Sequence, residues 1–194
     1  EYAVLRDAQP DDVDLVVGWG AYTKMATDHG WLFRSRRPEL GDDPRVSTTH
    51  GDAGSAALTL EAVKQSGVKR PRLAIIGAYG ASGGVVSRAA SLVDPESILL
   101  VGPPDKAGET EKLGKLQAQC RVVKEVAGNK YPVVTHQDKS RACLEHNSNV
   151  VIVATAGSLG LKPEDVPDGT LVLDVATPPG CVPDAGWSNG RLVL

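Results

Sequence analysis

The sequence predicts an α/β fold, a doubly wound parallel sheet preceded by part of a substrate-side α/β segment. Short apolar runs alternate with helical patterns over most of the chain beyond residue 70. The run Asn149–Thr155 (NVVIVAT) is apolar on both faces, as in a central parallel strand that helices cover. A glycine-rich turn joins the first of these strands to the helix after it.

The N-terminal part has fewer regular patterns. Val13–Gly18 (VDLVVG) predicts a short buried strand, and it runs into a glycine-aromatic turn at residues 18–24 (GWGAYTK). Leu32–Arg45, rich in Arg, Pro and Asp, predicts a loop.

A helix is predicted over Thr48–Gly67. Its apolar residues Ala56, Leu60 and Val63 recur at helical spacing, and Gly67 follows its last turn. The N-terminal cap is assigned to Thr49 or Asp52. We therefore assign residues 1–67 to a partial substrate-side segment with a linker helix, and residues 68–194 to the parallel-sheet domain.

The remaining elements alternate between strand and helix. The predicted strands are Leu73–Gly77, Ile98–Gly102, Pro132–Thr135, Asn149–Thr155, Gly169–Ala176 and Arg191–Leu194. The predicted helices are Ser82–Leu92, Ala107–Cys120 and Lys139–His146. This alternation predicts a sheet with strand order 3-2-1-4-5-6.

The glycine-rich turn, GAYGASGG at residues 77–84, has the pattern of a dinucleotide-binding loop. Gly77 allows the tight turn, Gly80 lets the backbone approach a pyrophosphate, and Gly83 or Gly84 lets the helix pack closely. The helix N-terminus then presents its N–H groups to the anion. The alternative is a purely structural glycine turn.

Several side chains near this turn are candidates for cofactor contact. Tyr79 is expected to line the site, and Ser82 to cap the helix and donate to phosphate. Residues 155–158 end the fourth strand, where such sheets meet a nicotinamide. The residues predicted to bind the cofactor are Gly77, Tyr79, Gly80, Ala81, Ser82, Gly83, Lys106, Thr155 and Ala156.

The second strand indicates which dinucleotide binds. NAD-binding sheets place an Asp or Glu at its tip to hold the ribose 2′-OH, but this chain has GPP at residues 102–104. Without that carboxylate a 2′-phosphate is not repelled, and Lys106 or Arg88 can pair with it. The sequence therefore predicts NADP, with NAD as the alternative if Asp105 binds the ribose.

Composition excludes several classes of function. A net charge of −3 gives no electrostatic footprint for nucleic acid, and Arg34, Arg36 and Arg37 form only a short, interrupted cluster. No apolar stretch reaches the length of a membrane span and no signal sequence opens the chain, so a cytoplasmic location is expected. The three cysteines are widely spaced and predict neither a disulfide framework nor a metal site. Because the chain begins without Met and closes on RLVL, we expect it to be a fragment of a longer protein.

A set of motifs resembles the long-chain acyl-ACP reductases of cyanobacteria in order and spacing. These are GWGAYTK (18–24), TTHGDAGSAALTLEAV (48–63), LAIIGAYGASGGVVSRAA (73–90), VVIVATAGSLGL (150–161) and TLVLDVATPPGCVPDAG (170–186). The same layout is similar, more broadly, to shikimate dehydrogenase and glutamyl-tRNA reductase, in which a substrate-domain helix leads into a nucleotide-binding Rossmann sheet.

The resemblance implies specific site residues. Gly77, Gly80 and Gly83 match the cofactor loop, and Thr49, Gly51 and Asp52 match a TTGN-type segment. Two residues of that segment differ from the family, since Asp52 stands where it has Asn and His50 where it has Thr. That family's acyl-accepting cysteine lies beyond the point where this chain stops. Thioester reduction needs a thiolate, and Cys181, at the carboxyl edge of the sheet, is the internal cysteine that merits a test.

The candidate catalytic residues are His50, Lys24 and Cys181. His50 can act as a general acid near the nicotinamide, or it can be part of the helix-capping region. Lys24 can orient a carbonyl, or it can be an exposed loop residue. Asp174, inside an apolar strand, is expected to make a structural hydrogen bond to a neighbouring loop.

Two functions are compatible with these residues and motifs. The first is an NADPH-dependent reductase, or a fragment of one, that acts on an acyl thioester or a related carbonyl, as a small molecule or bound to a carrier protein. The second is a non-catalytic NAD(P)-binding domain of a larger biosynthetic or regulatory protein. Both are compatible with a homo-oligomer.

Overall fold

The computed structural model describes residues 15–18, 46–49, 52–102, 110–157, 159–182 and 186–187. The chain divides into two compact units, Glu1–Ala53 and Gly54–Leu194. In the first unit, β1 (Leu15–Gly18) pairs in parallel with β2 (Val46–Thr49). The helix predicted from Thr48 is corrected here, because Thr48 and Thr49 belong to β2.

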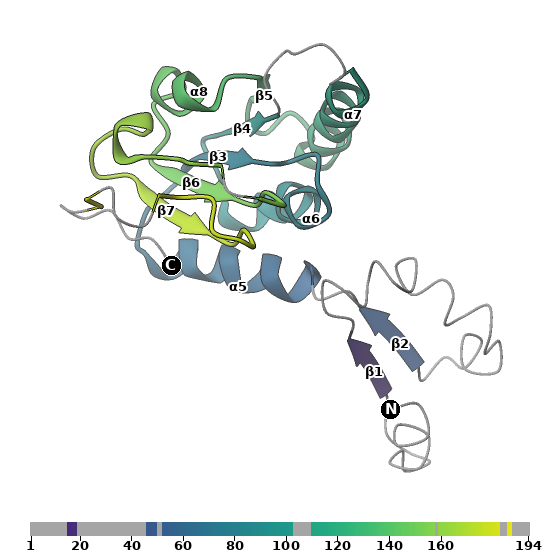
Figure 1. Ribbon diagram of the computed structural model, residues 1–194. Helices are drawn as coiled ribbons and strands as arrows, with labels where there is room; N and C mark the ends of the chain where they lie inside the picture. The colour runs from purple at the N-terminus through teal and green to yellow at the C-terminus, as the bar shows by residue number, and fades with distance from the viewer. Residues whose placement is uncertain are drawn as a thin grey trace. The chain divides into compact units, whose positions relative to one another are not determined.

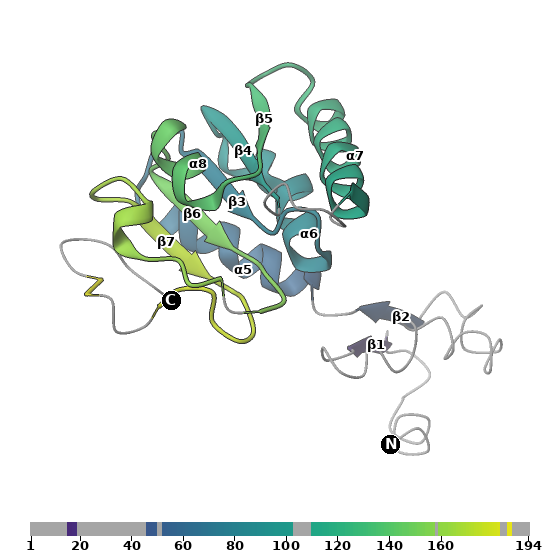
Figure 2. The same cartoon turned by 45° about the horizontal axis from the view of Figure 1, so that its top comes forward.

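The second unit contains a five-stranded parallel sheet, which Figures 1 and 2 show from two directions. Its strands are β3 (Arg72–Ile76), β4 (Ser97–Val101), β5 (Val133–His136), β6 (Val150–Val153) and β7 (Leu171–Asp174). They lie in the order β5-β4-β3-β6-β7, so the predicted fold class and its first five strand positions are confirmed. The predicted sixth strand, Arg191–Leu194, lies outside the described residues.

Helices cover both faces of the sheet (Figure 1). They are α5 (Asp52–Gln65), α6 (Ala81–Ala89), α7 (Thr110–Ala127) and α8 (Lys139–Glu145). Two 3-10 turns, Ala90–Val93 and Pro163–Asp165, complete the described elements. Helices α5, α6 and α7 contribute to one buried cluster and α8 contributes to another, so each face of the sheet has its own core.

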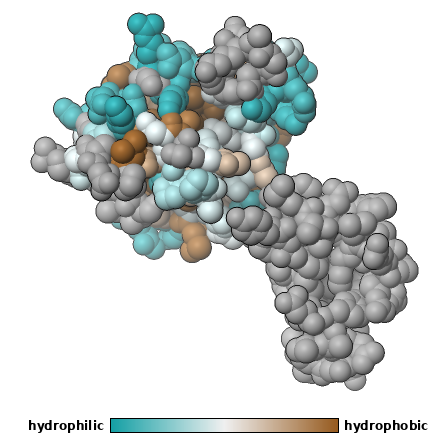
Figure 3. All heavy atoms as spheres, viewed as in Figure 1, coloured by the Kyte–Doolittle hydropathy of each residue, from teal (hydrophilic) through white to brown (hydrophobic). Residues whose placement is uncertain are grey.

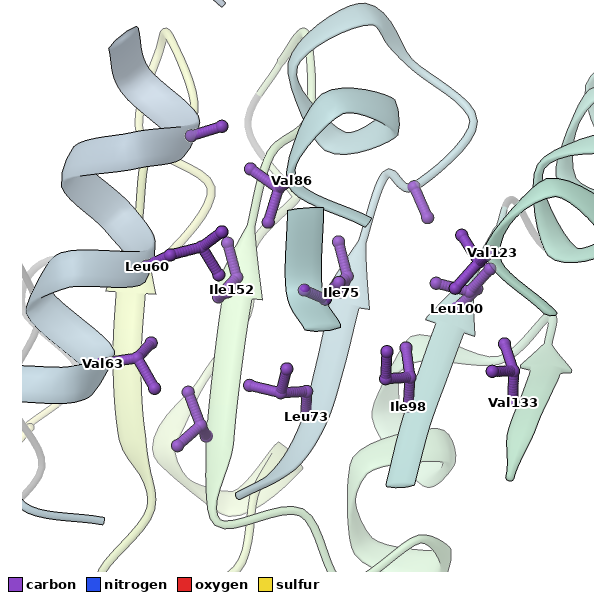
Figure 4. Close-up of a cluster of buried hydrophobic side chains, with 14 of the residues drawn as sticks. Leu60, Val63, Leu73, Ile75, Val86, Ile98, Leu100, Val123, Val133 and Ile152 are labelled. Carbon is purple, nitrogen blue, oxygen red and sulfur yellow. The ribbon is translucent and has the colours of Figure 1, made fainter. Parts of the chain in front are cut away.

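The two cores follow from the alternation of side chains along parallel strands. Figure 4 shows the larger core, in which Leu73 and Ile75 of β3 face the same side as Leu60 of α5 and Val86 of α6. The alternate residues Ala74 and Ile76 point to the other face, toward α8. The strands therefore need apolar residues at almost every position, which is the pattern in the sequence.

Three helix boundaries can be compared with the predicted ones. Helix α6 begins at Ala81 with Gly80 as its N-cap, so Ser82 lies in the first turn and is not the capping residue. Helix α7 continues to Ala127 because Val123 and Ala127 extend its buried stripe. Gly67 follows α5 with φ +77°, as the predicted stop requires.

The described surface is mainly hydrophilic on the face shown in Figure 3, where hydrophobic residues are scattered. Among the described helices, none has the combination of length and hydropathy that a membrane crossing requires.

Candidate functional site

The candidate site lies at the carboxyl edge of the sheet, between β3 and β6. Strand order reverses here, because β4 and β5 lie on one side of β3 while β6 and β7 lie on the other. Open sheets of this kind bind ligands outside the carboxyl ends of the strands, at the point where the strand order reverses.

Gly77 makes the turn at the end of β3. Its φ is +85°, and its N–H donates to the carbonyl oxygen of Val101 at 3.0 Å, which ties the turn to β4. A Cβ on Gly77 would lie 2.6 Å from the carbonyl oxygen of Ala154 and 3.1 Å from Cγ2 of Thr155. Both the conformation and the space require glycine, and the loop lies directly against the tip of β6.

The next glycines bring α6 onto this loop. A Cβ on Gly83 would lie 2.3 Å from the carbonyl oxygen of Gly77, whereas one on Gly84 would meet nothing closer than 3.6 Å. The close packing that the sequence assigned to either residue thus belongs to Gly83. Gly80 donates its N–H to the Gly77 carbonyl oxygen at 2.9 Å, and a Cβ there would lie 3.3 Å from the same oxygen.

The N-terminus of α6 faces the glycine turn. The helix ladder begins with the N–H of Gly84, which donates to the carbonyl oxygen of Gly80 at 2.8 Å. The N–H groups that precede it in the first turn, from Ala81 onward, are the ones that a phosphate uses at such a helix start. Tyr79, within the glycine turn, is partly buried and packs against the larger core.

The tip of β4 has no room for an acidic side chain. A Cβ on Gly102 would lie 2.5 Å from Cδ2 of Leu116 in α7. The carboxylate that holds the ribose 2′-OH in NAD-binding sheets therefore has no place at this position. Of the two cations suggested for a 2′-phosphate, Arg88 donates to Oε1 of Gln119 at 3.3 Å, and Lys106 lies outside the described residues.

The end of β7 is organised by Asp174. One carboxylate oxygen accepts the N–H of Ala176 at 3.1 Å, and the other accepts the N–H of Cys181 at 2.8 Å. The predicted structural role of Asp174 toward a neighbouring loop is confirmed. Leu161 continues the attachment, because its N–H donates to the Gly180 carbonyl oxygen and its own carbonyl oxygen accepts the N–H of Val182.

Gly180 is a site residue that was not predicted from the sequence. A Cβ on it would lie 2.4 Å from Cγ1 of Val153 and 3.4 Å from Oγ1 of Thr155, so the returning arm of the loop lies on the tip of β6. The sequence signal at this position was a glycine that follows two prolines. The loops after β3, β6 and β7 thus converge on Ala154 and Thr155.

Cys181 is buried, and its surroundings oppose ionisation. Burial, the charge of Asp174 and a hydrogen bond with that carboxylate together raise the pKa of Cys181 to about 12. Cys143 is also buried, and burial with the charge of Asp165 raises its pKa to about 12. A thiolate nucleophile is disfavoured at both positions at neutral pH.

The other two catalytic candidates, Lys24 and His50, lie outside the described residues. The structure therefore brings together the glycine turn, the start of α6 and the tip of β6, and it describes no side chain at Lys24, His50, Lys106 or Ser158. In the part of the chain that the structure describes, no three His, Cys, Asp or Glu side chains are grouped as a metal site would need.

A mainly apolar hollow of about 310 Å³ lies beside the end of β7. Helix α5 lines it with Ser55, Leu58, Thr59 and Ala62, and the end of β7 and the residue after it line it with Leu173, Asp174 and Val175. Thr59 donates its hydroxyl to the Ser55 carbonyl oxygen at 2.7 Å, within α5.

No family model matches the chain, and no curated protein matches it significantly. Solved structures with a similar fold include shikimate 5-dehydrogenase from Listeria monocytogenes in complex with shikimate and NAD, with a TM-score of 0.53 at 16% identity over 78% of this chain. Quinate dehydrogenase from Corynebacterium glutamicum in complex with NAD matches with a TM-score of 0.51 at 18% identity over 82% of this chain. The ligand-free 5-ketofructose reductase of Gluconobacter sp. strain CHM43 matches with a TM-score of 0.51 at 16% identity over 77% of this chain.

These likenesses show a fold that the chain shares with NAD-binding dehydrogenases. The chain spans about half the length of the structures it matches, since it covers 52% of the ketofructose reductase, 54% of the shikimate enzyme and 58% of the quinate enzyme. The broad resemblance to shikimate dehydrogenase is thus supported at the level of the fold, while the narrower resemblance to acyl-ACP reductases has no counterpart among these structures.

Proposed function

We propose that this chain holds the NADP(H) site of an oxidoreductase that acts on a small carbonyl compound. The observation that carries the proposal is the convergence of the glycine turn and the N-terminus of α6 on the tip of β6, at the point where strand order reverses. Two of the similar structures are complexes with NAD, which supports a dinucleotide as the ligand.

The residues present fit such a ligand. Gly80, the N-cap of α6, has no side chain to hold a pyrophosphate away from the backbone, and the first turn of α6 supplies N–H donors. When bound, the nicotinamide supplies the hydride chemistry. In this proposal the chain itself binds the pyrophosphate, and the loops after β6 and β7 line the pocket of the nicotinamide ring.

The choice of NADP rests on Gly102 and Leu116. Because α7 leaves no space for a carboxylate at the tip of β4, nothing at that position repels a 2′-phosphate. We assign the partner of the phosphate to Lys106, on the sequence alone. NAD remains the alternative ligand.

The proposed substrate is a ketone, an aldehyde or the corresponding alcohol. Acyl-thioester reduction by this chain would need a thiolate, but all three cysteines are buried and two have a pKa raised to about 12. The apolar hollow beside β7 suits a compound with a small apolar side. We assign the proton donor to His50 or Lys24, because a developing alkoxide needs a cationic or acidic partner.

A second candidate is a non-catalytic NAD(P)-binding domain. The same cysteine burial favours it, because it removes covalent acyl chemistry from this chain. The two candidates differ in turnover, since only the first predicts substrate-dependent oxidation of NADPH by a panel of small ketones and aldehydes, reduced by His50→Ala or Lys24→Ala.

Calorimetric titration of the chain with NADPH and NADH tests the proposed ligand. We expect binding of NADPH, weakened at least tenfold by Gly80→Val, whose side chain would block the approach of the pyrophosphate. Gly114→Ala is the matched control, since a Cβ there meets nothing within 4 Å. Failure of the unchanged chain to bind either dinucleotide would contradict the proposal.

Cofactor choice needs its own variant. Lys106→Gln should weaken NADPH by roughly 1.5–3 kcal/mol, the size of a charge-assisted hydrogen bond, and leave NADH nearly unchanged. Equal losses for both dinucleotides would mean that the 2′-phosphate binds elsewhere.

A further inference from the structure

The loop at residues 175–181 is attached at both of its ends. At its start, the N–H of Val175 donates to the carbonyl oxygen of Val153 at 2.9 Å, which extends the pairing of β7 with β6 by one residue. At its end, Gly180 and Val182 bond to Leu161 at 3.0 and 2.9 Å. The exposed apex at residues 177–179 lies between these attachments.

Asp174 links the two ends of this loop. Its two carboxylate oxygens accept N–H groups that are two and seven residues further along the chain, at 3.1 and 2.8 Å. One side chain at the last position of β7 therefore fixes the first and the last turn of the loop together. Hydrogen bonds to an ionised acceptor are about twice as strong as neutral ones.

The 175–181 loop also packs against the tip of β6. Gly180 approaches Val153 and Thr155 so closely that a side chain would clash, with 2.4 Å to Cγ1 of Val153. Thr155 in turn donates its hydroxyl to the carbonyl oxygen of Gly157 at 2.8 Å, which shapes the neighbouring loop. Movement of the 175–181 loop would therefore uncover the tip of β6 on the side of β7, whereas the glycine turn contacts that tip from the side of β3.

We infer that Asp174 is a positioning residue for the nicotinamide half of the cofactor: by clamping the N–H groups of Ala176 and Cys181 it holds the 175–181 loop as a wall beside the tip of β6. This inference rests on the proposed function. In the proposed complex, the glycine turn and α6 bind the adenosine and pyrophosphate half of the cofactor. The hydrogen bonds of Asp174 therefore affect the nicotinamide half only.

Comparing two ligands separates the contribution of the nicotinamide from that of the rest of the cofactor. NADPH contains the nicotinamide, whereas 2′-phospho-ADP-ribose is the same molecule without it. In the full 194-residue chain, Asp174→Ala should weaken NADPH roughly tenfold, the scale of one lost charge-assisted hydrogen bond, and leave 2′-phospho-ADP-ribose within about twofold. The change in nicotinamide fluorescence on binding should shrink in the same variant.

Two further variants serve as controls. Asp174→Asn keeps one acceptor oxygen and should restore part of the NADPH affinity. Glu125→Gln removes the same charge from an exposed position on α7 and should change neither affinity. Urea unfolding of each variant shows whether it is folded at the titration temperature.

The outcomes distinguish the two claims. If the unchanged chain binds neither ligand, the proposed function is wrong and the inference falls with it. If Asp174→Ala weakens both ligands equally, or neither, the inference alone is overturned. It is also overturned if both Asp174 variants unfold, because the carboxylate would then support the fold as a whole.

Discussion

Leu116 of α7 occupies the space that a side chain on Gly102 would need, with its Cδ2 at 2.5 Å from the position of a Cβ. Leu116 is fully buried, so its side chain cannot move outward without opening the core beneath α7. The glycine at the tip of β4 is therefore a consequence of how α7 packs, and the same contact disfavours an acidic side chain at this position.

This contact predicts a compensating pair of substitutions. Gly102→Ala should lower the free energy of unfolding by about 1–3 kcal/mol through overpacking. Leu116→Ala should lower it by about 2–5 kcal/mol. In the Leu116→Ala background, Gly102→Ala should cost almost nothing, because the space is then open. Urea denaturation of the unchanged chain, the two single variants and the double variant measures the coupling free energy between the two positions. Additive losses of stability would contradict a steric contact between Gly102 and Leu116.

The neighbouring glycines of α6 predict opposite effects of the same substitution. Gly83→Ala should lower the free energy of unfolding by about 1–3 kcal/mol or more, because its Cβ would meet the rigid backbone oxygen of Gly77. Gly84→Ala should raise stability by up to about 1 kcal/mol, since it removes a helix-interior glycine without a clash. Thermal unfolding compares the two. Similar values would show that α6 does not rest on the glycine turn.

His146 predicts a dependence of stability on pH. Its Nε2 lies 2.9 Å from Oγ of Ser97 and its Nδ1 lies 2.8 Å from Oγ of Ser148. Burial and the charge of Arg72 lower the pKa of His146 below 6.5, although Glu96 opposes this shift. The unfolded chain then binds the proton more readily, so stability should fall as the pH drops below about 6.5, down to the pKa of the folded state.

Urea unfolding at pH 8 and pH 5.5 measures this dependence. His146→Gln, which keeps a polar side chain but does not titrate, should remove part of the loss at low pH. The prediction fails if the variant and the unchanged chain lose equal stability between the two pH values.

The burial of the three cysteines predicts that their thiols are unreactive in the folded chain. Because Cys143 and Cys181 have pKa values of about 12 and all three cysteines are buried, iodoacetamide at pH 8 should label the folded chain very slowly. In urea it should label all three. Mass spectrometry after timed quenching gives the count.

The same burial predicts that the chain does not reduce acyl thioesters by a covalent route. NADPH oxidation with an acyl thioester should stay at background and be unchanged in Cys181→Ser. Rapid labelling of Cys181 together with turnover that Cys181→Ser abolishes would instead make Cys181 the nucleophile.

The sequence predicted the sheet well because its signal is local. Four strands of the second unit, β3, β4, β6 and β7, are short and mainly apolar runs, and a glycine turn follows β3. Strand β2 escaped prediction because Val46–Thr49 is short, polar and paired with a distant segment. The choice between Gly83 and Gly84 could not be made either, since it depends on the rotation of α6 about its axis.

The site was predictable only in part, for a similar reason. Asp174 stood out as an acid within an apolar strand, and its hydrogen bonds followed the expectation. The contact of Gly180 with Val153 joins segments that are far apart in the chain and leaves no local pattern. Steric exclusion between distant segments depends on tertiary packing, so it cannot be predicted from the identity of single residues.

The position of β3 at the centre of the sheet also predicts an order of folding. Arg72 at the start of β3 donates its N–H to Oδ1 of Asn149, which is 77 residues away, whereas β4 lies at roughly a third of that separation. Closing the longer loop costs about 1 kcal/mol more chain entropy. During synthesis the β3–α6–β4 unit can therefore assemble while β6 is still being made, leaving one edge of β3 open. Pulsed hydrogen exchange should protect the amides of β4 before those of β6, and a nascent chain halted before residue 150 should expose that edge to chaperones.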